Sequence, residues 1–174
     1  MRILETERLI LRPITEDDAG FTVELLNSPS FLKYIGDRGV KTEEEARAYL
    51  HKGPLKSERE NGFGLFVLIS KESGVAIGTC SLVKRDGLEG EVDLGFALLP
   101  EFEGKGYGFE SSVEVMRFAK EELGLNRLVA IAVSYNKSSI HLLEKLGFSH
   151  EKMIKLPGDE EELMLFGVKG GPLI

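Results

Sequence analysis

The stretch EVDLGFALLPEFEGKGYG, residues 91–108, decides the fold of this chain. It passes from an apolar strand pattern into a loop with Gly104, Gly106 and Gly108 at alternate positions, and a helical pattern follows at once. The first N–H groups of a helix have no acceptor within the helix and carry partial positive charge. Glycine lets a ligand approach the backbone closely. A strand, a glycine loop and a helix in this order therefore predict a site for a phosphorylated cofactor.

The spacing of the glycines separates the known classes of phosphate loop. A nucleoside triphosphate loop reads G-x-x-x-x-G-K followed by Ser or Thr, whereas here Lys105 lies between two glycines. A dinucleotide loop reads G-x-G-x-x-G inside a parallel βαβ unit, and here the third glycine comes one residue early. ATP and NAD are therefore disfavoured as ligands. A tight structural turn remains the alternative explanation for the loop taken alone.

A second pattern lies downstream of another apolar strand, which spans residues 127–133. It reads NKSSIHLLEKLGF over residues 136–148. Asn136 is placed to cap the N-terminus of a helix, apolar residues recur at helical spacing, and Gly147 supplies a left-handed stop. The pattern therefore predicts a short capped helix. Its place after the glycine loop makes two ordered motifs in one chain.

These two patterns together resemble the pyrophosphate loop and the later helix of the GNAT N-acetyltransferase superfamily, which binds acetyl-coenzyme A. The opening LETERLILRP, residues 4–13, resembles the first strand of the branch that acetylates the N-termini of ribosomal proteins and many small amines. The resemblance covers nearly the whole chain. It implies an α/β (α+β) fold in a single domain over residues 1–174. That fold is a mixed, mostly antiparallel sheet of about seven strands flanked by helices, with strands 4 and 5 splayed around the cofactor.

The resemblance also implies acetyl-CoA as the cosubstrate and assigns its contacts. The backbone of residues 96–98 is expected to pair with the pantetheine amides, much as an added strand does. The loop N–H groups are expected to hold the pyrophosphate, and Asn136 to bond the pantetheine arm. The expected cofactor-binding residues are Phe96, Ala97, Leu98, Glu103, Gly104, Lys105, Gly106, Tyr107, Gly108, Asn136 and Ser139.

Acetyl transfer to an amine needs a base for the ammonium and an acid for the departing thiolate. Glu91 and Asp93 lie two residues apart on one expected strand and so share a face. Either is a candidate base, with Asp93 nearer the acetyl group, and two solvated acids are the alternative. The tyrosine that serves as general acid in many superfamily members aligns with Leu143. Ser139 is then the nearest hydroxyl and the candidate acid, its alternative role being a first-turn helix contact.

Three departures from the family pattern keep a second function open. Glu103 stands where Gln or Arg is usual, and an ionised carboxylate donates no hydrogen bond. Phe109 stands where Thr is frequent, and Leu143 replaces the acidic tyrosine. The competing hypothesis is therefore a module that binds acetyl-CoA or CoA without catalysing transfer.

The composition limits the possible partners and the location of the protein in the cell. The 174 residues include 42% hydrophobic ones and carry a net charge of −7. That charge argues against a nucleic-acid partner and suits a cationic acceptor, a protein N-terminus or a small amine, although ordinary solubility is the alternative. No apolar run approaches the roughly 20 residues of a membrane span, and no signal peptide is visible. We expect a cytoplasmic protein without a membrane partner, and a homodimer is left open.

The remaining residues predict the other elements. Cys80, the one cysteine, is expected to be a buried strand residue, and the three histidines lack ligand spacing, so no metal is expected. Capping boxes at Thr15 and Thr42 open two helices, the second of which ends at Gly53-Pro54. The segments expected to face the acceptor are the loop 27–41 and the turn 157–161. Further strands are expected at residues 8–12, 63–70, 75–84, 151–156 and 162–168.

Overall fold

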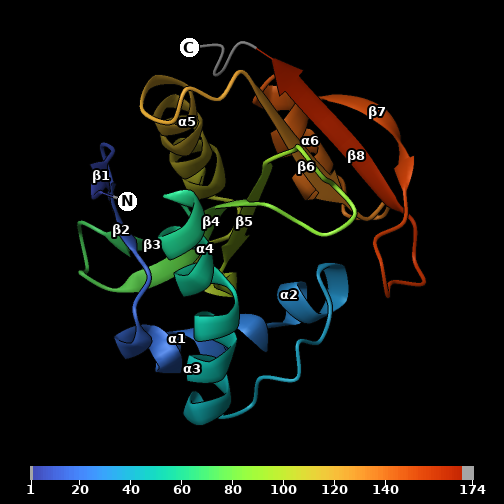
Figure 1. Ribbon diagram of the computed structural model, residues 1–174. Coiled ribbons are helices and arrows are strands. Elements are labelled where there is room, and N and C mark those ends of the chain that lie inside the picture. Colours follow the sequence, from blue (N-terminus) through green and yellow to red (C-terminus); the bar gives the residue numbers. More distant parts are fainter. Residues whose placement is uncertain (1, 170–174) are drawn as a thin grey trace.

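An eight-stranded mixed sheet runs through the computed structural model, which describes residues 2–169 (Figure 1). Its order is β1-β2-β3-β4-β5-β6-β8-β7. The β5–β6 pair is parallel and every other neighbouring pair is antiparallel. The strands are β1 (Leu4–Glu5), β2 (Leu9–Pro13), β3 (Leu65–Ser70), β4 (Ala76–Val83), β5 (Asp93–Leu98), β6 (Arg127–Ala132), β7 (Ser149–Ile154) and β8 (Leu163–Lys169).

The predicted fold class is confirmed, with one strand more than expected. The additional strand is β1, two residues long, which pairs with β2 through Leu4 opposite Leu11. Residues 1 and 170–174 of the expected domain lie outside the described residues. No helix in the described part of the chain combines the length and the apolar character that crossing a membrane requires.

Helices cover both faces of the sheet. They are α1 (Ala19–Leu26), α2 (Pro29–Tyr34), α3 (Glu43–Lys52), α4 (Pro54–Asn61), α5 (Tyr107–Glu121) and α6 (Lys137–Lys145). Along β5, Phe96 and Leu98 pack with α5 and α6 in the largest core cluster. Ala97, one position away, packs with α1, α2 and α3 on the opposite face. This alternation follows from the two-residue period of a strand.

Two helices lie where the sequence predicted none. The six-residue α2 lies inside the expected loop 27–41, and α4 begins directly after α3 ends. Both start at a proline, Pro29 and Pro54, and proline is well tolerated in the first helical turn because that N–H needs no acceptor there. Gly53-Pro54 therefore ends one helix, as predicted, and also begins the next. The capping boxes at Thr15 and Thr42 are both confirmed.

The sheet opens between β5 and β6, the fourth and fifth of the predicted strands. Asp93 is opposite Val129, and the Val129 N–H donates to the Val92 carbonyl at 2.9 Å. No other residue pair of these two strands is in register within the described residues. Residues 95–98 are half-buried although β5 lies in the middle of the sheet. The edge of β5 beyond Asp93 is therefore free to pair with something else.

Candidate active site

The glycine loop joins β5 to α5 through the short 3₁₀ turn Pro100–Phe102. Gly104 and Gly106 have φ of 72° and 85°, in the left-handed region that favours glycine. Gly106 is the N-cap of α5, and no side chain caps this helix. The N–H groups of residues 104–109 find no hydrogen-bond acceptor among residues 2–169. The loop thus presents a row of unsatisfied donors at the positive end of a 15-residue helix.

The third glycine of the loop has a different purpose from the first two. Gly108 lies within α5 and is buried. A Cβ at this position would come within 3.2 Å of Leu142 Cδ2, on α6. Gly108 therefore allows α5 and α6 to approach each other closely.

Other side chains of the loop lie at the surface. Glu103 accepts hydrogen bonds from the hydroxyl of Ser30, on α2, at 3.0 and 3.2 Å. The departure from the family pattern thus links the loop to α2. Lys105 is exposed, with Nζ 5.9 Å from the centroid of the Phe102 ring. Phe109 is half-buried beneath Lys145, whose Nζ lies 4.7 Å from the ring centroid.

Asp93 is the most unusual carboxylate of the site. It shares a face with Gly95 and Ala97, which is the face that α1, α2 and α3 cover. The residue is 1% exposed. Arg85 Nε pairs with Oδ2, while Oδ1 is buried and has no partner among the described residues. Burial raises the pKa of Asp93 by more than the Arg85 guanidinium lowers it. A carboxylate with a raised pKa is a better proton acceptor for an ammonium than an ordinary one.

Glu91 lies two residues before β5 begins, not on the strand as expected. It accepts a hydrogen bond from Arg127 Nε at 2.9 Å. Arg127, at the start of β6, also makes two bonds of 2.7 Å to Glu151, on β7. Glu91 is therefore part of an ion-pair network that joins the segment before β5 to β6 and β7, and its role as a base stays a prediction.

The helix after β6 begins as predicted. The Asn136 side chain accepts from the Ser139 backbone N–H at 3.2 Å and caps α6. Gly147, with φ of 95°, ends the same segment. Ser139 is half-buried in the first turn. Leu143, at the position of the family's tyrosine, is 1% exposed and belongs to the core. The N-cap is confirmed, and the acid role of Ser139 stays a prediction.

The two segments expected to face the acceptor meet through one tyrosine. Tyr34, the last residue of α2, has its ring centroid 5.9 Å from that of Tyr135, in the β6–α6 loop. The Tyr135 hydroxyl donates to Glu161 at 3.0 Å, and this bond raises the pKa of Tyr135. The α2 segment and the β7–β8 turn are therefore linked next to Asn136.

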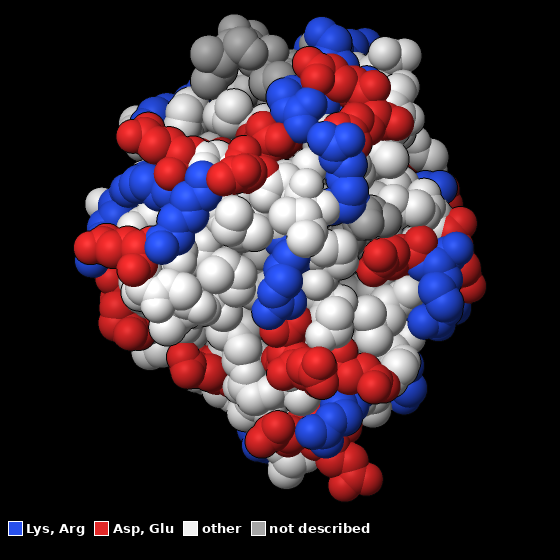
Figure 2. Space-filling view, turned by 90° about the vertical axis from the view of Figure 1, so that its left-hand side faces the viewer, with Lys and Arg blue, Asp and Glu red and all other residues white. Residues whose placement is uncertain are grey.

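Two further expectations concern Cys80 and the charge of the protein surface. Cys80 is fully buried in β4, and burial raises the pKa of its thiol to about 12. It is a core residue, as predicted. On the face drawn in Figure 2, basic and acidic side chains are interspersed, and no continuous basic surface of the kind that nucleic acids need covers this face.

Sequence reasoning missed two groups of residues near the site. The first is Arg85, the partner of Asp93. The register of β4 and β5 places Val83 opposite Asp93, and knowledge of that register would have indicated the nearby Arg85. The other is the contact of Thr6 and Arg8 with Glu110. The opening strand motif contained both N-terminal residues, but nothing in the sequence indicated their partner.

Comparisons with known proteins agree with this geometry. The model of the acetyltransferase (GNAT) domain matches residues 8–149. An uncharacterized N-acetyltransferase of Bacillus licheniformis, p20, is 30% identical over 156 residues, covering 89% of this chain and 86% of the relative. Spermidine N(1)-acetyltransferase of Escherichia coli K12 is 25% identical over 141 residues, covering 81% and 73%. The fold is similar to that of RimL, a ribosomal L7/L12 α-N-protein acetyltransferase solved with coenzyme A. That match has a TM-score of 0.81 and 18% identity, covering 96% and 97%.

Proposed function

The chain belongs to the GNAT acetyltransferase family, and from that premise we propose that this N-acetyltransferase moves the acetyl group of acetyl-CoA to a primary amine by direct transfer in a ternary complex. One observation carries the proposal. The unsatisfied N–H groups at the start of α5 adjoin the opening between β5 and β6. Pyrophosphate suits the first feature, and the pantetheine amides suit the second.

Acetyl-CoA is the donor that the site residues fit. The pyrophosphate accepts from the N–H groups of residues 104–108. The pantetheine arm pairs with the free edge of residues 96–98 and reaches Asn136. The structural relative RimL was solved with coenzyme A, which supports this choice of donor.

The transfer itself is a balanced exchange of one bond for another. The amine nitrogen attacks the thioester carbonyl carbon, a C–N bond forms, and the C–S bond breaks. Asp93 accepts the proton that the ammonium gives up, and its unpaired Oδ1 and raised pKa favour this role over Glu91. Amide formation then removes a second proton from the nitrogen. The coenzyme thiolate takes a proton from Ser139, and the second nitrogen proton passes through water to Ser139 and restores its hydroxyl. An N–H near Leu98 faces the carbonyl oxygen and stabilises the oxyanion.

The acceptor is an amine that is protonated in solution. One relative is named for spermidine and a structural relative for a ribosomal-protein N-terminus. Both acceptors carry a primary ammonium group, and the net charge of −7 favours cations. We place the reaction in the cytoplasm. A homodimer stays a prediction, which sedimentation at several protein concentrations tests.

The test has two stages. Coenzyme A, but not NAD or ATP, should raise the Tm, because a ligand that binds only the folded state stabilises it. A panel of amines and peptides is then incubated with acetyl-CoA, and mass spectrometry identifies any acetylated product. Thiol release that depends on an amine supports the enzyme. Coenzyme binding without any transfer across the panel would favour the binding module instead, and a Tm rise with NAD alone would contradict the donor assignment.

A further inference from the structure

Three residues join the N-terminal segment to the first turn of α5. The Glu110 carboxylate accepts a hydrogen bond from the Thr6 hydroxyl at 2.6 Å. It also accepts from the Arg8 backbone N–H at 2.9 Å and from Arg8 Nε at 2.7 Å. The Glu110 side chain is only 19% exposed. Its burial raises its pKa, but the three hydrogen bonds outweigh that and keep the pKa below its usual range. The carboxylate is therefore an ionised anchor for Arg8.

The other end of the Arg8 guanidinium lies against the glycine loop. Nη1 donates to the Lys105 carbonyl at 3.0 Å. The guanidinium carbon lies 4.1 Å from the centroid of the Tyr107 ring, a cation–π contact. Nη2 would be 3.3 Å from a Cβ at Gly106. One planar side chain thus contacts Lys105 and Tyr107 and occupies the space beside the Gly106 between them.

The contact with Lys105 fixes the direction of a donor. A trans peptide is planar, so the carbonyl of one residue and the N–H of the next point in opposite directions. The chain has no cis peptide among residues 2–169. When Arg8 holds the Lys105 carbonyl, the Gly106 N–H must point away from Arg8. That N–H is one of the unsatisfied loop donors.

Lys105 lies between two glycines, so the backbone around the Lys105–Gly106 peptide bond has unusual conformational freedom unless other contacts restrict it. Gly104 and Gly106 are both in the left-handed region, and glycine has more conformational freedom than any other residue. A loop ordered before its ligand arrives loses less entropy on binding. We propose that Arg8, held by Thr6 and Glu110, is a positioning residue that orients the loop for the coenzyme pyrophosphate. This inference rests on the proposed function.

The surroundings make Arg8 suitable for substitution. The cluster borders an open cavity of about 420 Å³, lined by Thr6, Arg8, Gly106, Phe109 and Glu110 among others. Water can therefore reach the Lys105 carbonyl once the guanidinium is removed. Such water satisfies the carbonyl but does not hold it in one direction. Loss of Arg8 should thus affect the order of the loop more than the fold.

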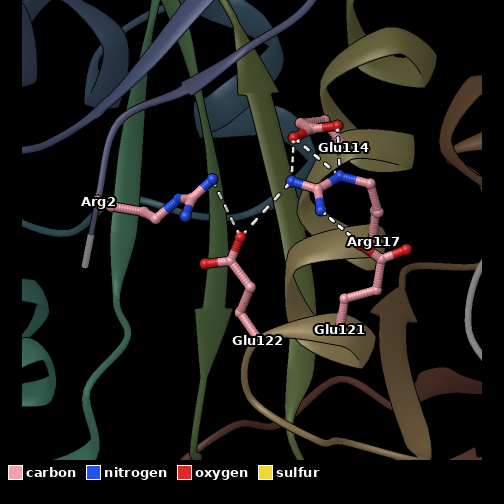
Figure 3. A network of polar contacts seen from close by, with 5 residues as sticks. All are labelled: Arg2, Glu114, Arg117, Glu121 and Glu122. Carbon is pink, nitrogen blue, oxygen red and sulfur yellow. Dashed lines mark hydrogen bonds and ion pairs between the residues drawn. The ribbon is translucent and has the colours of Figure 1, made fainter.

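A second arginine cluster on the same helix supplies the matched control. Arg117 pairs with Glu114 and Glu121, and it shares Glu122 with Arg2 of the N-terminal segment (Figure 3). Arg117 resembles Arg8 in forming several charged hydrogen bonds at a partly exposed site, with side chains 32% and 41% exposed. It has no contact with the glycine loop among the described residues.

The experiment compares Arg8→Ala, Arg8→Lys and Arg117→Ala by calorimetry with acetyl-CoA and by steady-state kinetics. We expect Arg8→Ala to weaken acetyl-CoA binding about tenfold, because a loop that is no longer ordered in advance loses more entropy on binding. The KM for acetyl-CoA should rise while kcat and the KM for the acceptor stay unchanged. Arg8→Lys retains the charge but not the fork to both partners, so it should fall between Arg8→Ala and the wild type. Arg117→Ala should bind like the wild type.

Glu110→Gln keeps the test valid if Arg8→Ala does not fold. It retains the side-chain shape, removes the charge that anchors Arg8, and should raise the same KM. A merely structural role would lower Tm and kcat without changing the affinity of the folded fraction, and that result would overturn the inference. If the wild type and the Arg8 variants bind acetyl-CoA with equal affinity, the inference about Arg8 is wrong and the proposed function still stands. Absence of acetyl-CoA binding by the wild type would overturn the proposed function together with it.

Discussion

At the scale of single residues, Asp93 combines burial with an unpaired oxygen, and this arrangement costs folding stability. We predict that Asp93→Asn lowers kcat by about a hundredfold near neutral pH, within the range of general acid–base groups. The Tm should stay equal or rise, because a buried charge is removed and Arg85, 32% exposed, remains hydrated. Kinetics and thermal unfolding of the same preparation check both parts.

The pH profile makes this prediction sharper. A raised pKa means that Asp93 is protonated, and useless as a base, up to a higher pH than the usual value of about 4. The acid limb of kcat should move with the substitution, and the loss should shrink at high pH where free amine already exists. Glu91→Gln and Ser139→Ala are compared in the same assay. If Glu91→Gln shows the loss instead, the base is Glu91, and a wild-type rate for Ser139→Ala excludes its acid role.

Gly106 carries the second prediction at this scale. Gly106→Val should abolish measurable acetyl-CoA binding in a folded protein, because a branched side chain is strained at φ of 85° and would meet Arg8. Gly74→Val is the control. Gly74 has φ of 73°, in the β3–β4 turn, with nothing within 4 Å of a Cβ. Calorimetry should show normal binding for the control, and the loop assignment fails if Gly106→Val also binds normally.

Individual residues differ in how far the sequence revealed them. The left-handed Gly147 and the Asn136 cap follow from local chemistry and are confirmed. Gly108 looked like a third loop glycine, yet its place depends on Leu142, a residue 34 positions away in the sequence. The Asp93–Arg85 pair likewise depends on strand register. Contacts of this kind follow from tertiary packing, which a local pattern does not contain.

At the scale of elements, the N-cap residue of α6, Asn136, contributes both to the stability of the helix and to the proposed coenzyme site. Asn136→Ala should cost about 0.5–2 kcal/mol of stability and also raise the KM for acetyl-CoA, because the proposed pantetheine contact is lost. Thr42→Ala is the control, since Thr42 caps α3 by the same kind of bond. It should cost similar stability in chemical unfolding and leave the KM unchanged. Equal KM values for both variants would reduce Asn136 to a cap.

The elements themselves were largely predictable where signals are local. Strands with alternating or apolar patterns, capped helices and the glycine turns were found within a few residues. The helices α2 and α4 were missed because they are short and begin with proline, a residue that also ends helices. The two-residue β1 was missed because its pairing with β2 is a tertiary contact.

At the scale of the whole molecule, carboxylates held by hydrogen bonds and arginine partners set the response of stability to acid. Burial raises the pKa of Asp18, but hydrogen bonds from Arg12 and Thr15 outweigh this and keep the pKa below its usual range. Glu110 behaves in the same way. A depressed folded-state pKa gives stability that is complete above the unfolded pKa and is lost as the pH falls through the folded pKa. We therefore predict that the free energy of unfolding decreases as the pH drops below about 4.

Urea unfolding between pH 7 and pH 3 measures this loss. Asp93 acts in the opposite direction, because its pKa is raised in the folded state. Its contribution to the free energy of unfolding rises as the pH falls through that pKa, and this gain is complete before Asp18 and Glu110 lose theirs. Asp18→Asn should flatten the profile. A profile of unchanged slope in that variant would show that other carboxylates dominate.

The sheet has a weakly paired boundary, here called the seam, between β5 and β6, because these strands share a single residue pair in register among residues 2–169. On one side lie β1–β5, on the other β6–β8, and within the described residues Asp93 and Val129 alone connect them in register. A cosubstrate bound along the free edge of β5 would supply hydrogen bonds that the chain itself leaves unmade. On the proposed function, part of the cohesion of this sheet belongs to a molecule that is used up and replaced in every turnover. The two halves are then held together most firmly while the coenzyme is bound, and the seam is weakest between one coenzyme and the next.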